Sequence, residues 1–426
     1  MPELLTTARR QLGTLGHAGQ RLPALLASRV VEQCVIGLAS LLLAARLGPA
    51  EFAPVSVLLI ANSAAVTLSD WGVGLSVLRR APGEHVARRS LTGMRLANLT
   101  LLAGGVLAGI AVGGTTGVVL VASATIWWST AEAYLAKAAA INVGDGHRAA
   151  VAEIVGSVVF IVPVVAVATA DAAVVVVGAA LVAKHLAEAL VAGRPGFAFA
   201  ANGARPELGA MWGTQMLAFL VGNADYVVVA LVLGAEAFSI YSVGYRVAVA
   251  IPSVVAYAAT RTSLADLGAA GSPALRQTRF LAYVRPLFAL GVAGAVVAAT
   301  VGAVLPGILG AGWDGLAATI AVLAVAAPWR MVFGQAGALT LVARRSHALV
   351  VRQVVQLVGF VALGVVAALV GYGTFVAMTT CCWIVSVTLM TKAASDDASI
   401  RGWPALPSLA LLGIAVVVTV AVVLPW

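Results

Sequence analysis

One aspartate and two arginines, Asp225, Arg246 and Arg330, lie deep inside long apolar segments of this 426-residue chain. Asp225 comes eight residues before Leu233, and Arg246 comes eight residues after Phe238. At 1.5 Å per residue, both charges would lie about 12 Å from the same turn, on adjacent antiparallel helices. We therefore expect an ion pair between them. It could lock the helix hairpin or bind a substrate, and the spacing leaves both roles open.

Arg330 follows Pro328 and Trp329 in an apolar stretch that has no nearby acid. Irregular backbone at membrane depth is tolerated where it is buried in protein or lines a water-filled cavity. A guanidinium binds phosphate oxygens with paired hydrogen bonds, so a lipid diphosphate is an anion that it could neutralise. Arg330 is thus a candidate substrate-binding residue, and pairing with a distant acid is the equal alternative.

Several acids also lie inside apolar segments, and each could bind a coupling proton or sodium ion. Ser63, Thr67, Asp70 and Gly74 recur at helical spacing and would form one polar stripe. The candidate residues for ion coupling are Asp70, Glu132, Glu32 and Glu153. Because ionisable side chains in membrane helices usually face a cavity or a partner, the alternative for each is a purely structural pairing.

Arg29 is the fourth candidate for contact with an anionic substrate, and Glu32 is close enough along a helix to pair with it. Alternatively, Arg29 extends its guanidinium group to the membrane surface. Lys184, His185 and Glu188 cluster near the end of an apolar segment, and we expect them to be interfacial anchors.

Other chemistry is disfavoured by what the sequence contains. The three cysteines, Cys34, Cys381 and Cys382, lie in apolar segments without a disulfide or metal spacing. The net charge of +9 is better explained by basic loops facing the cytoplasm than by a nucleic-acid partner. We expect no enzymatic reaction, no cofactor and no metal site.

The elements that must position these residues are membrane-spanning helices. The chain is 61% hydrophobic and only 10% charged, with a mean hydropathy of +1.02. About 20 apolar residues span a bilayer as a helix, and runs of that length recur along the whole sequence. The expected segments are 24–46, 53–78, 92–113, 116–139, 148–169, 172–192, 208–233, 238–261, 279–304, 315–343, 347–370, 372–392 and 405–425. The sequence predicts an all-α polytopic membrane protein with 12–13 transmembrane helices.

The distribution of basic residues predicts the orientation. If the N-terminus is cytoplasmic and each segment reverses direction, nearly all of the 26 lysines and arginines fall in or beside cytoplasmic segments. The bias never inverts along the chain, which supports the segment order. We therefore expect a multi-pass protein of the cytoplasmic membrane.

An internal repeat predicts two lobes. Leu47, Gly48, Phe52, Ser56 and Val57 recur 186 residues later, in the pattern LGxxxFxxxSV, and both copies occupy an outer turn. Six segments lie between equivalent points, so the two lobes would share one orientation about an axis along the membrane normal. The expected domains are a cytoplasmic lead-in at 1–23, a six-helix bundle at 24–192, a cytoplasmic linker at 193–207, a second six-helix bundle at 208–392, and a cytoplasmic loop with an extra helix at 393–426.

The chain resembles the polysaccharide and oligosaccharide exporters, the Wzx-like flippases, of a superfamily that also contains multidrug antiporters and the lipid II flippase. Three stretches carry the resemblance: ARLGPAEFAPVSV, LSDWGVGLSVLRR and NADYVVVALVLGAEAFSIYSVGYRVA. Ala53 stands where glycine is usual in that family. The resemblance implies two six-helix bundles around a central cavity that opens alternately to each side of the membrane.

The function implied by this resemblance is translocation of a lipid-linked oligosaccharide for surface polysaccharide assembly. The implied substrate is a polyprenyl-diphosphate-linked glycan in the lipid bilayer, and the implied partners are a polysaccharide polymerase and glycosyltransferases. A cation-coupled multidrug antiporter of the same superfamily is the alternative, although Arg246 and Arg330 would suit cationic drugs poorly. A non-transporting membrane scaffold is the third class, and it would not need charges at depth.

Overall fold

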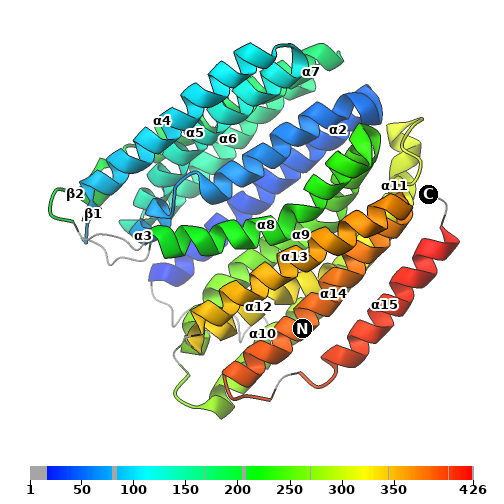
Figure 1. Ribbon diagram of the computed structural model, residues 1–426. Coiled ribbons are helices and arrows are strands. Elements are labelled where there is room, and N and C mark those ends of the chain that lie inside the picture. Colours follow the sequence, from blue (N-terminus) through cyan, green and yellow to red (C-terminus); the bar gives the residue numbers. More distant parts are fainter. Residues whose placement is uncertain are drawn as a thin grey trace. The chain divides into compact units, whose positions relative to one another are not determined.

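The computed structural model describes residues 17–78, 84–167, 169–203, 208–268, 270–343, 345–401 and 403–424. Within them the chain is almost entirely helical, and the expected segments fall on helices, although 53–78 and 315–343 are each divided between two (Figure 1). The helices are α2 (His17–Leu68), α3 (Val73–Leu78), α4 (Arg88–Val112), α5 (Gly114–Asn142), α6 (Gly146–Val165), α7 (Ala170–Ala192), α8 (Leu208–Val232), α9 (Gly234–Gly268), α10 (Pro273–Leu309), α11 (Leu316–Val325), α12 (Ala327–Val342), α13 (Ser346–Val370), α14 (Tyr372–Asp397) and α15 (Leu406–Val423).

Ten helices in the described part of the chain are long and apolar enough to cross a membrane, and the pair α11 and α12, bent by 40°, makes eleven. The segment α2 counts once in that number, although a non-helical residue divides it. Many of the large apolar side chains are exposed, as expected where lipid replaces water around a protein. The chain is therefore an all-α polytopic membrane protein, as its sequence predicts.

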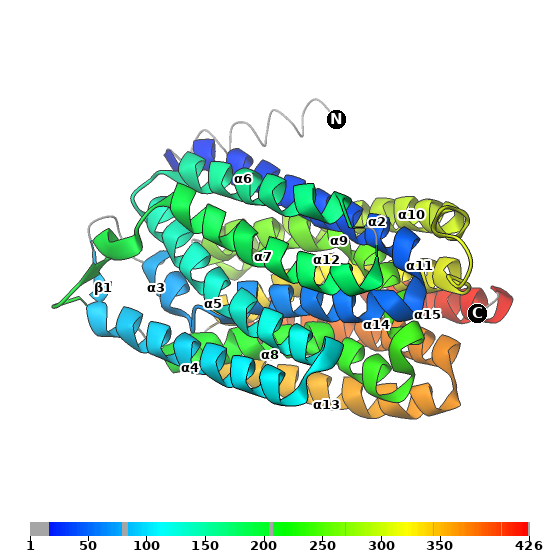
Figure 2. The same ribbon diagram turned by 90° about the horizontal axis from the view of Figure 1, so that it is seen from above.

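The helices gather into two compact units. Unit 1 comprises residues 1–43 and 54–216, and unit 2 comprises residues 44–53 and 217–426. In unit 1, α4, α5, α6 and α7 run side by side with the described parts of α2 (Figures 1 and 2). In unit 2, α9 packs against α10, α11 and α12, and α14 lies between α12, α13 and α15. The domain boundaries expected from the sequence, including a linker at 193–207, stay a prediction.

The repeated turn has the same backbone form in both of its copies. Gly48 interrupts α2 with φ 69°, and Gly234 begins α9 with φ 86°, both in the left-handed region that side chains disfavour. The phenylalanine that follows each glycine is buried, at 0% exposure for Phe52 and 4% for Phe238. Phe52 packs edge-on against Trp313 within unit 2, with ring centroids 6.1 Å apart. The turn therefore depends on a glycine and an aromatic anchor in each copy.

A small parallel sheet joins two connecting segments of unit 1. Strand β1 (Val86–Ala87) pairs with β2 (Phe199–Ala200), which follows the short 3-10 helix η1 (Pro195–Ala198). Val86 and Ala87 are buried, and Val86 belongs to an apolar cluster with Leu135 and Phe199. The sheet therefore fixes the segment after α7 to the segment before α4.

Candidate functional site

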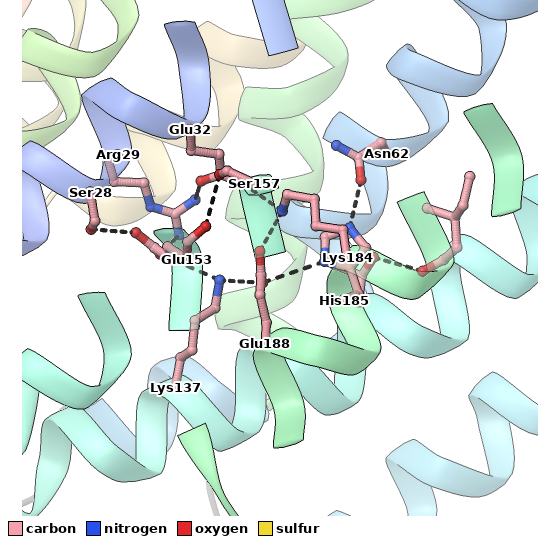
Figure 3. A network of polar contacts seen from close by, with 12 residues as sticks. Ser28, Arg29, Glu32, Asn62, Lys137, Glu153, Ser157, Lys184, His185 and Glu188 are labelled. Carbon is pink, nitrogen blue, oxygen red and sulfur yellow. Dashed lines mark hydrogen bonds and ion pairs between the residues drawn. The ribbon is translucent and has the colours of Figure 1, made fainter. Parts of the chain in front are cut away.

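A network of charged side chains is buried at one end of unit 1, where α5 turns into α6 (Figure 3). Four helices supply it, and the residues are Arg29 and Glu32 from α2, Lys137 from α5, Glu153 from α6, and Lys184, His185 and Glu188 from α7. Excluding His185, three cations face three carboxylates. Each of these charged residues lies within a helix, because the residues around it are strong helix formers, chiefly alanine and leucine.

The six charges form a closed ring in which the signs alternate. The nitrogen–oxygen distances around the ring are 2.8 Å for Arg29–Glu32, 2.7 Å for Glu32–Lys184, 2.5 Å for Lys184–Glu188, 2.8 Å for Glu188–Lys137, 3.3 Å for Lys137–Glu153 and 3.1 Å for Glu153–Arg29. Every cation thus contacts two carboxylates, and every carboxylate contacts two cations. The ring carries no net charge.

Neutral side chains complete this ring. The Ser28 hydroxyl donates a hydrogen bond to Glu153 at 2.7 Å. His185 Nε2 lies 2.7 Å from the Asn62 amide oxygen, and its Nδ1 lies 3.5 Å from Glu188. Burying a charge is tolerated when it is paired, and each of the six ring charges contacts two partners of opposite sign, although Nδ1 of the neighbouring His185 has no hydrogen-bond partner among the described residues.

The ring contains three of the residues that the sequence singled out and corrects the interpretation of three others. Arg29 and Glu32 form the expected pair. Lys184, His185 and Glu188 are not interfacial anchors, because their side chains are almost wholly buried. The spacing of a lysine and an acid four residues apart in an apolar helix could have indicated an internal pair.

Asp70 does not lie on a helical stripe with Ser63 and Thr67, because α2 ends at Leu68. Its carboxylate instead accepts hydrogen bonds from the backbone N–H groups of Gly72, at 3.0 Å, and Gly74, at 2.9 Å. This arrangement caps the start of α3 and closes the turn between α2 and α3. The expected single helix over 53–78 is broken for that reason.

Glu132 lies apart from the ring. It forms a two-pronged ion pair with Arg95 of α4, with distances of 2.7 and 2.6 Å. The two side chains are 20% and 44% exposed, so water or lipid head groups can reach them.

In unit 2, Arg330 occupies the first turn of α12, just after the bend at Ala326. Its Nη1 donates a hydrogen bond to the Tyr245 hydroxyl at 2.5 Å, and its Nη2 lies 3.9 Å from Asp225. The guanidinium lies between two aromatic rings, 4.6 Å from the centroid of Tyr245 and 4.1 Å from that of Trp383. Yet Nε and Nη2 are buried without a hydrogen-bond partner.

Asp225 is held mainly by neutral groups. The Tyr241 hydroxyl donates to it at 2.6 Å, and the backbone N–H of Tyr226 donates at 3.0 Å. Its cationic neighbour is Arg330 and not Arg246, so the expected pairing with Arg246 is wrong. Residues at equal depth on adjacent helices can still point in different directions, which sequence spacing does not reveal.

Further buried polar atoms in unit 2 lack partners. Arg246 is half-buried, and its Nε has none. Neither amide atom of Gln335 or Gln356 is hydrogen-bonded, although the exposures are 0% and 6%. Because folded proteins satisfy nearly all their buried polar groups, such atoms keep hydrogen-bonding capacity that the described protein groups do not use.

These contacts bear on the expected ion-coupling residues. Glu32 and Glu153 are each held by two cations, Glu132 by one, and Asp70 caps a turn. Their part in ion coupling stays a prediction. Within the ranges that the structure describes, no group of three or more histidine, cysteine, aspartate or glutamate side chains is arranged to hold a metal ion.

The fold is similar to that of solved membrane transporters. A MATE transporter in complex with MaL6 matches with a TM-score of 0.64 and 16% identity over 91% of this chain and 97% of that one. The lipid II flippase MurJ in an inward closed conformation matches with a TM-score of 0.64 and 9% identity over 94% and 98%. An outward-facing multidrug resistance MATE family transporter of the MOP superfamily matches with a TM-score of 0.57 and 14% identity over 91% and 96%.

No protein-family model matches the sequence, and no curated protein matches it. At such low identities the likeness establishes the fold and not the substrate. The chain therefore has the fold shared by MATE transporters and MurJ.

Proposed function

We propose that this protein is a flippase that moves a lipid-linked oligosaccharide across the cytoplasmic membrane for surface polysaccharide assembly. The observation that supports this most is Arg330 in unit 2, a buried guanidinium whose Nε and Nη2 have no hydrogen-bond partner in the described part of the chain. A cation in that state has binding capacity left for an anion, and a diphosphate presents several oxygens to it.

The surroundings of Arg330 favour an anion further. Arg330 lies on the first turn of α12, where the helix dipole places partial positive charge. Arg246, which does not pair with Asp225, adds a second half-buried cation to unit 2. A diphosphate would replace the 3.9 Å contact with Asp225 by closer, charge-assisted hydrogen bonds.

The proposed mechanism is alternating access. The substrate site would open first to the cytoplasm and then to the outside, while the lipid tail stays in the bilayer. The likeness to the structure named as the lipid II flippase MurJ supports a lipid-linked substrate. A polysaccharide polymerase and glycosyltransferases are the proposed partners, and the N-terminus is proposed to be cytoplasmic.

A cation-coupled multidrug antiporter is the second candidate. The feature that favours it is Asp225, which lies among the aromatic rings of Tyr226, Tyr241 and Tyr245. Aromatic rings and a carboxylate suit a cationic drug once Arg330 moves away. The likeness to solved MATE transporters also supports this class.

Deletion of the gene distinguishes the two functions. We expect lipid-linked oligosaccharide to accumulate in the inner leaflet and surface polysaccharide to be lost. Normal surface polysaccharide combined with increased drug sensitivity would support the antiporter and contradict the flippase.

Substitution of Arg330 tests the site. We expect Arg330→Ala to lower translocation at least about tenfold, because one charge-assisted contact to the diphosphate is worth that much. Arg330→Lys should retain part of the activity, since the charge remains but the paired geometry is lost. Arg401→Ala, at an exposed position, is the matched control. Full translocation by an Arg330→Ala protein that reaches the membrane in normal amount would remove this residue from the anion site.

A further inference from the structure

The position of Lys184 in the ring of unit 1 is unusual for a lysine. Its side chain is 0% exposed, and its ammonium lies between Glu32, at 2.7 Å, and Glu188, at 2.5 Å. Lysines are almost never buried completely unless they are paired, because the ammonium is strongly hydrated in water. The two carboxylates therefore replace the water that this ammonium has lost.

The chemistry of that position is that of a small monovalent cation. Oxygen atoms from two carboxylates converge on a single positive charge, which is the kind of donor that hard cations prefer. The charge is not free to leave, because a side chain of α7 carries it. The Lys184 side chain supplies the positive charge that an inorganic ion from solution would otherwise have to supply.

The rest of the ring leaves no carboxylate in need of a further cation. Glu188 is also held by Lys137 at 2.8 Å, and Glu32 by Arg29 at 2.8 Å. Glu153 contacts both Arg29 and Lys137. With His185 neutral the six charges sum to zero, so an additional cation would give the buried ring an uncompensated charge.

We propose that Lys184 is a built-in cation that occupies, between Glu32 and Glu188, the place of an exchangeable monovalent ion. Unit 1 then folds and keeps its arrangement without sodium. Removal of the ammonium turns the same position into a binding site for a small monovalent cation. This inference concerns the internal charge balance of unit 1 and does not rest on the proposed substrate.

The test uses the variant Lys184→Met, which keeps an unbranched side chain as far as Cε and removes the ammonium. Purified full-length protein is heated in detergent while NaCl is titrated against N-methylglucamine chloride at constant ionic strength. We expect the wild-type melting temperature to be the same in both salts. The variant should melt about 10 °C lower without sodium, because a buried ion pair has lost one partner, and should recover in a saturable way as sodium rises.

Two variants serve as matched controls. Lys392→Met removes a lysine at an exposed position of α14 and should behave like the wild type in both salts. Lys184→Met combined with Glu188→Gln restores the charge balance, and it should show no response to sodium. A sodium response in this double variant would contradict the assigned site.

The proposal has two clear ways to fail. A saturable, sodium-specific stabilisation of the wild type would show that an inorganic ion already binds there despite Lys184, and this measurement remains possible if Lys184→Met does not fold. If Lys184→Met folds and its melting temperature does not depend on sodium, Lys184 forms only a structural ion pair and the proposal is wrong. Neither result depends on a translocation assay, so the flippase hypothesis succeeds or fails separately.

Discussion

The buried charges of the two units are organised in opposite ways. In unit 1, every charge of the ring contacts two charges of opposite sign. Glu188, for example, contacts both Lys137 and Lys184. In unit 2, Arg330 keeps two nitrogens without a hydrogen bond, and Gln335 has no partner for either of its amide atoms. Networks that satisfy themselves fix a structure, whereas unsatisfied groups have capacity for a ligand. The comparison supports our proposal that the ring in unit 1 stabilises the structure and that Arg330 in unit 2 contacts the substrate.

The largest effect that this comparison predicts is the loss of a ring carboxylate. We expect Glu188→Gln to destabilise the protein by about 3–5 kcal/mol, because Lys137 and Lys184 each lose one of two carboxylates in a buried setting. Unfolding in detergent, followed by cysteine accessibility or fluorescence, measures the change.

The matched control for Glu188→Gln is Glu132→Gln, which breaks the partly exposed pair with Arg95. That pair should contribute about 0–1 kcal/mol. If both variants lost the same free energy of unfolding, the ring would stabilise unit 1 no more than an ordinary ion pair does.

A smaller effect is expected at Asp70, whose polar contacts are also satisfied. Asp70→Ala should cost about 1–2 kcal/mol, since two backbone N–H groups at the start of α3 lose their acceptor. Hydrogen exchange of the amides of Gly72 and Gly74 should accelerate more than exchange elsewhere in unit 1. Unchanged protection of both amides would argue against the capping role.

The smallest change in the free energy of unfolding should occur at Gln335, and there we expect no loss of stability. Gln335→Met replaces a buried amide without partners by an apolar chain of similar size, so the free energy of unfolding should stay equal or rise by about 1 kcal/mol. Translocation should fall if the amide contacts substrate. A clear loss of stability would mean that Gln335 has a structural partner and would weaken the contrast between the units.

The sequence predicted the helices well because hydrophobic length in a membrane is a strong local signal. It also indicated the glycine turns, since Gly48 and Gly234 recur with a phenylalanine four residues later. The sequence pattern does not predict the end of α2 at Leu68, because Asp70 also fits one more polar position on a helix. A carboxylate followed by Gly72 and Gly74 can instead cap a turn, which depends on short-range backbone geometry.

The site was predicted less completely. The sequence predicts the pair of Glu32 with Arg29 and gives Glu153 as an intramembrane acid, but it does not show that Lys184 of α7 and Lys137 of α5 are their lysine partners. A single sequence shows how deep a residue lies in a helix and not the direction in which its side chain points. The same limit led to the wrong partner for Asp225 in unit 2.

The closed form of the ring has a mechanical consequence. In an open chain of charges, breaking one contact leaves a charge at the end with no neighbour, whereas in a cycle every member keeps at least one. Thermal motion can therefore open the 3.3 Å contact between Lys137 and Glu153 without stranding either charge in the apolar interior. The ring can therefore lose any one of its six contacts and still keep each charge beside one of opposite sign.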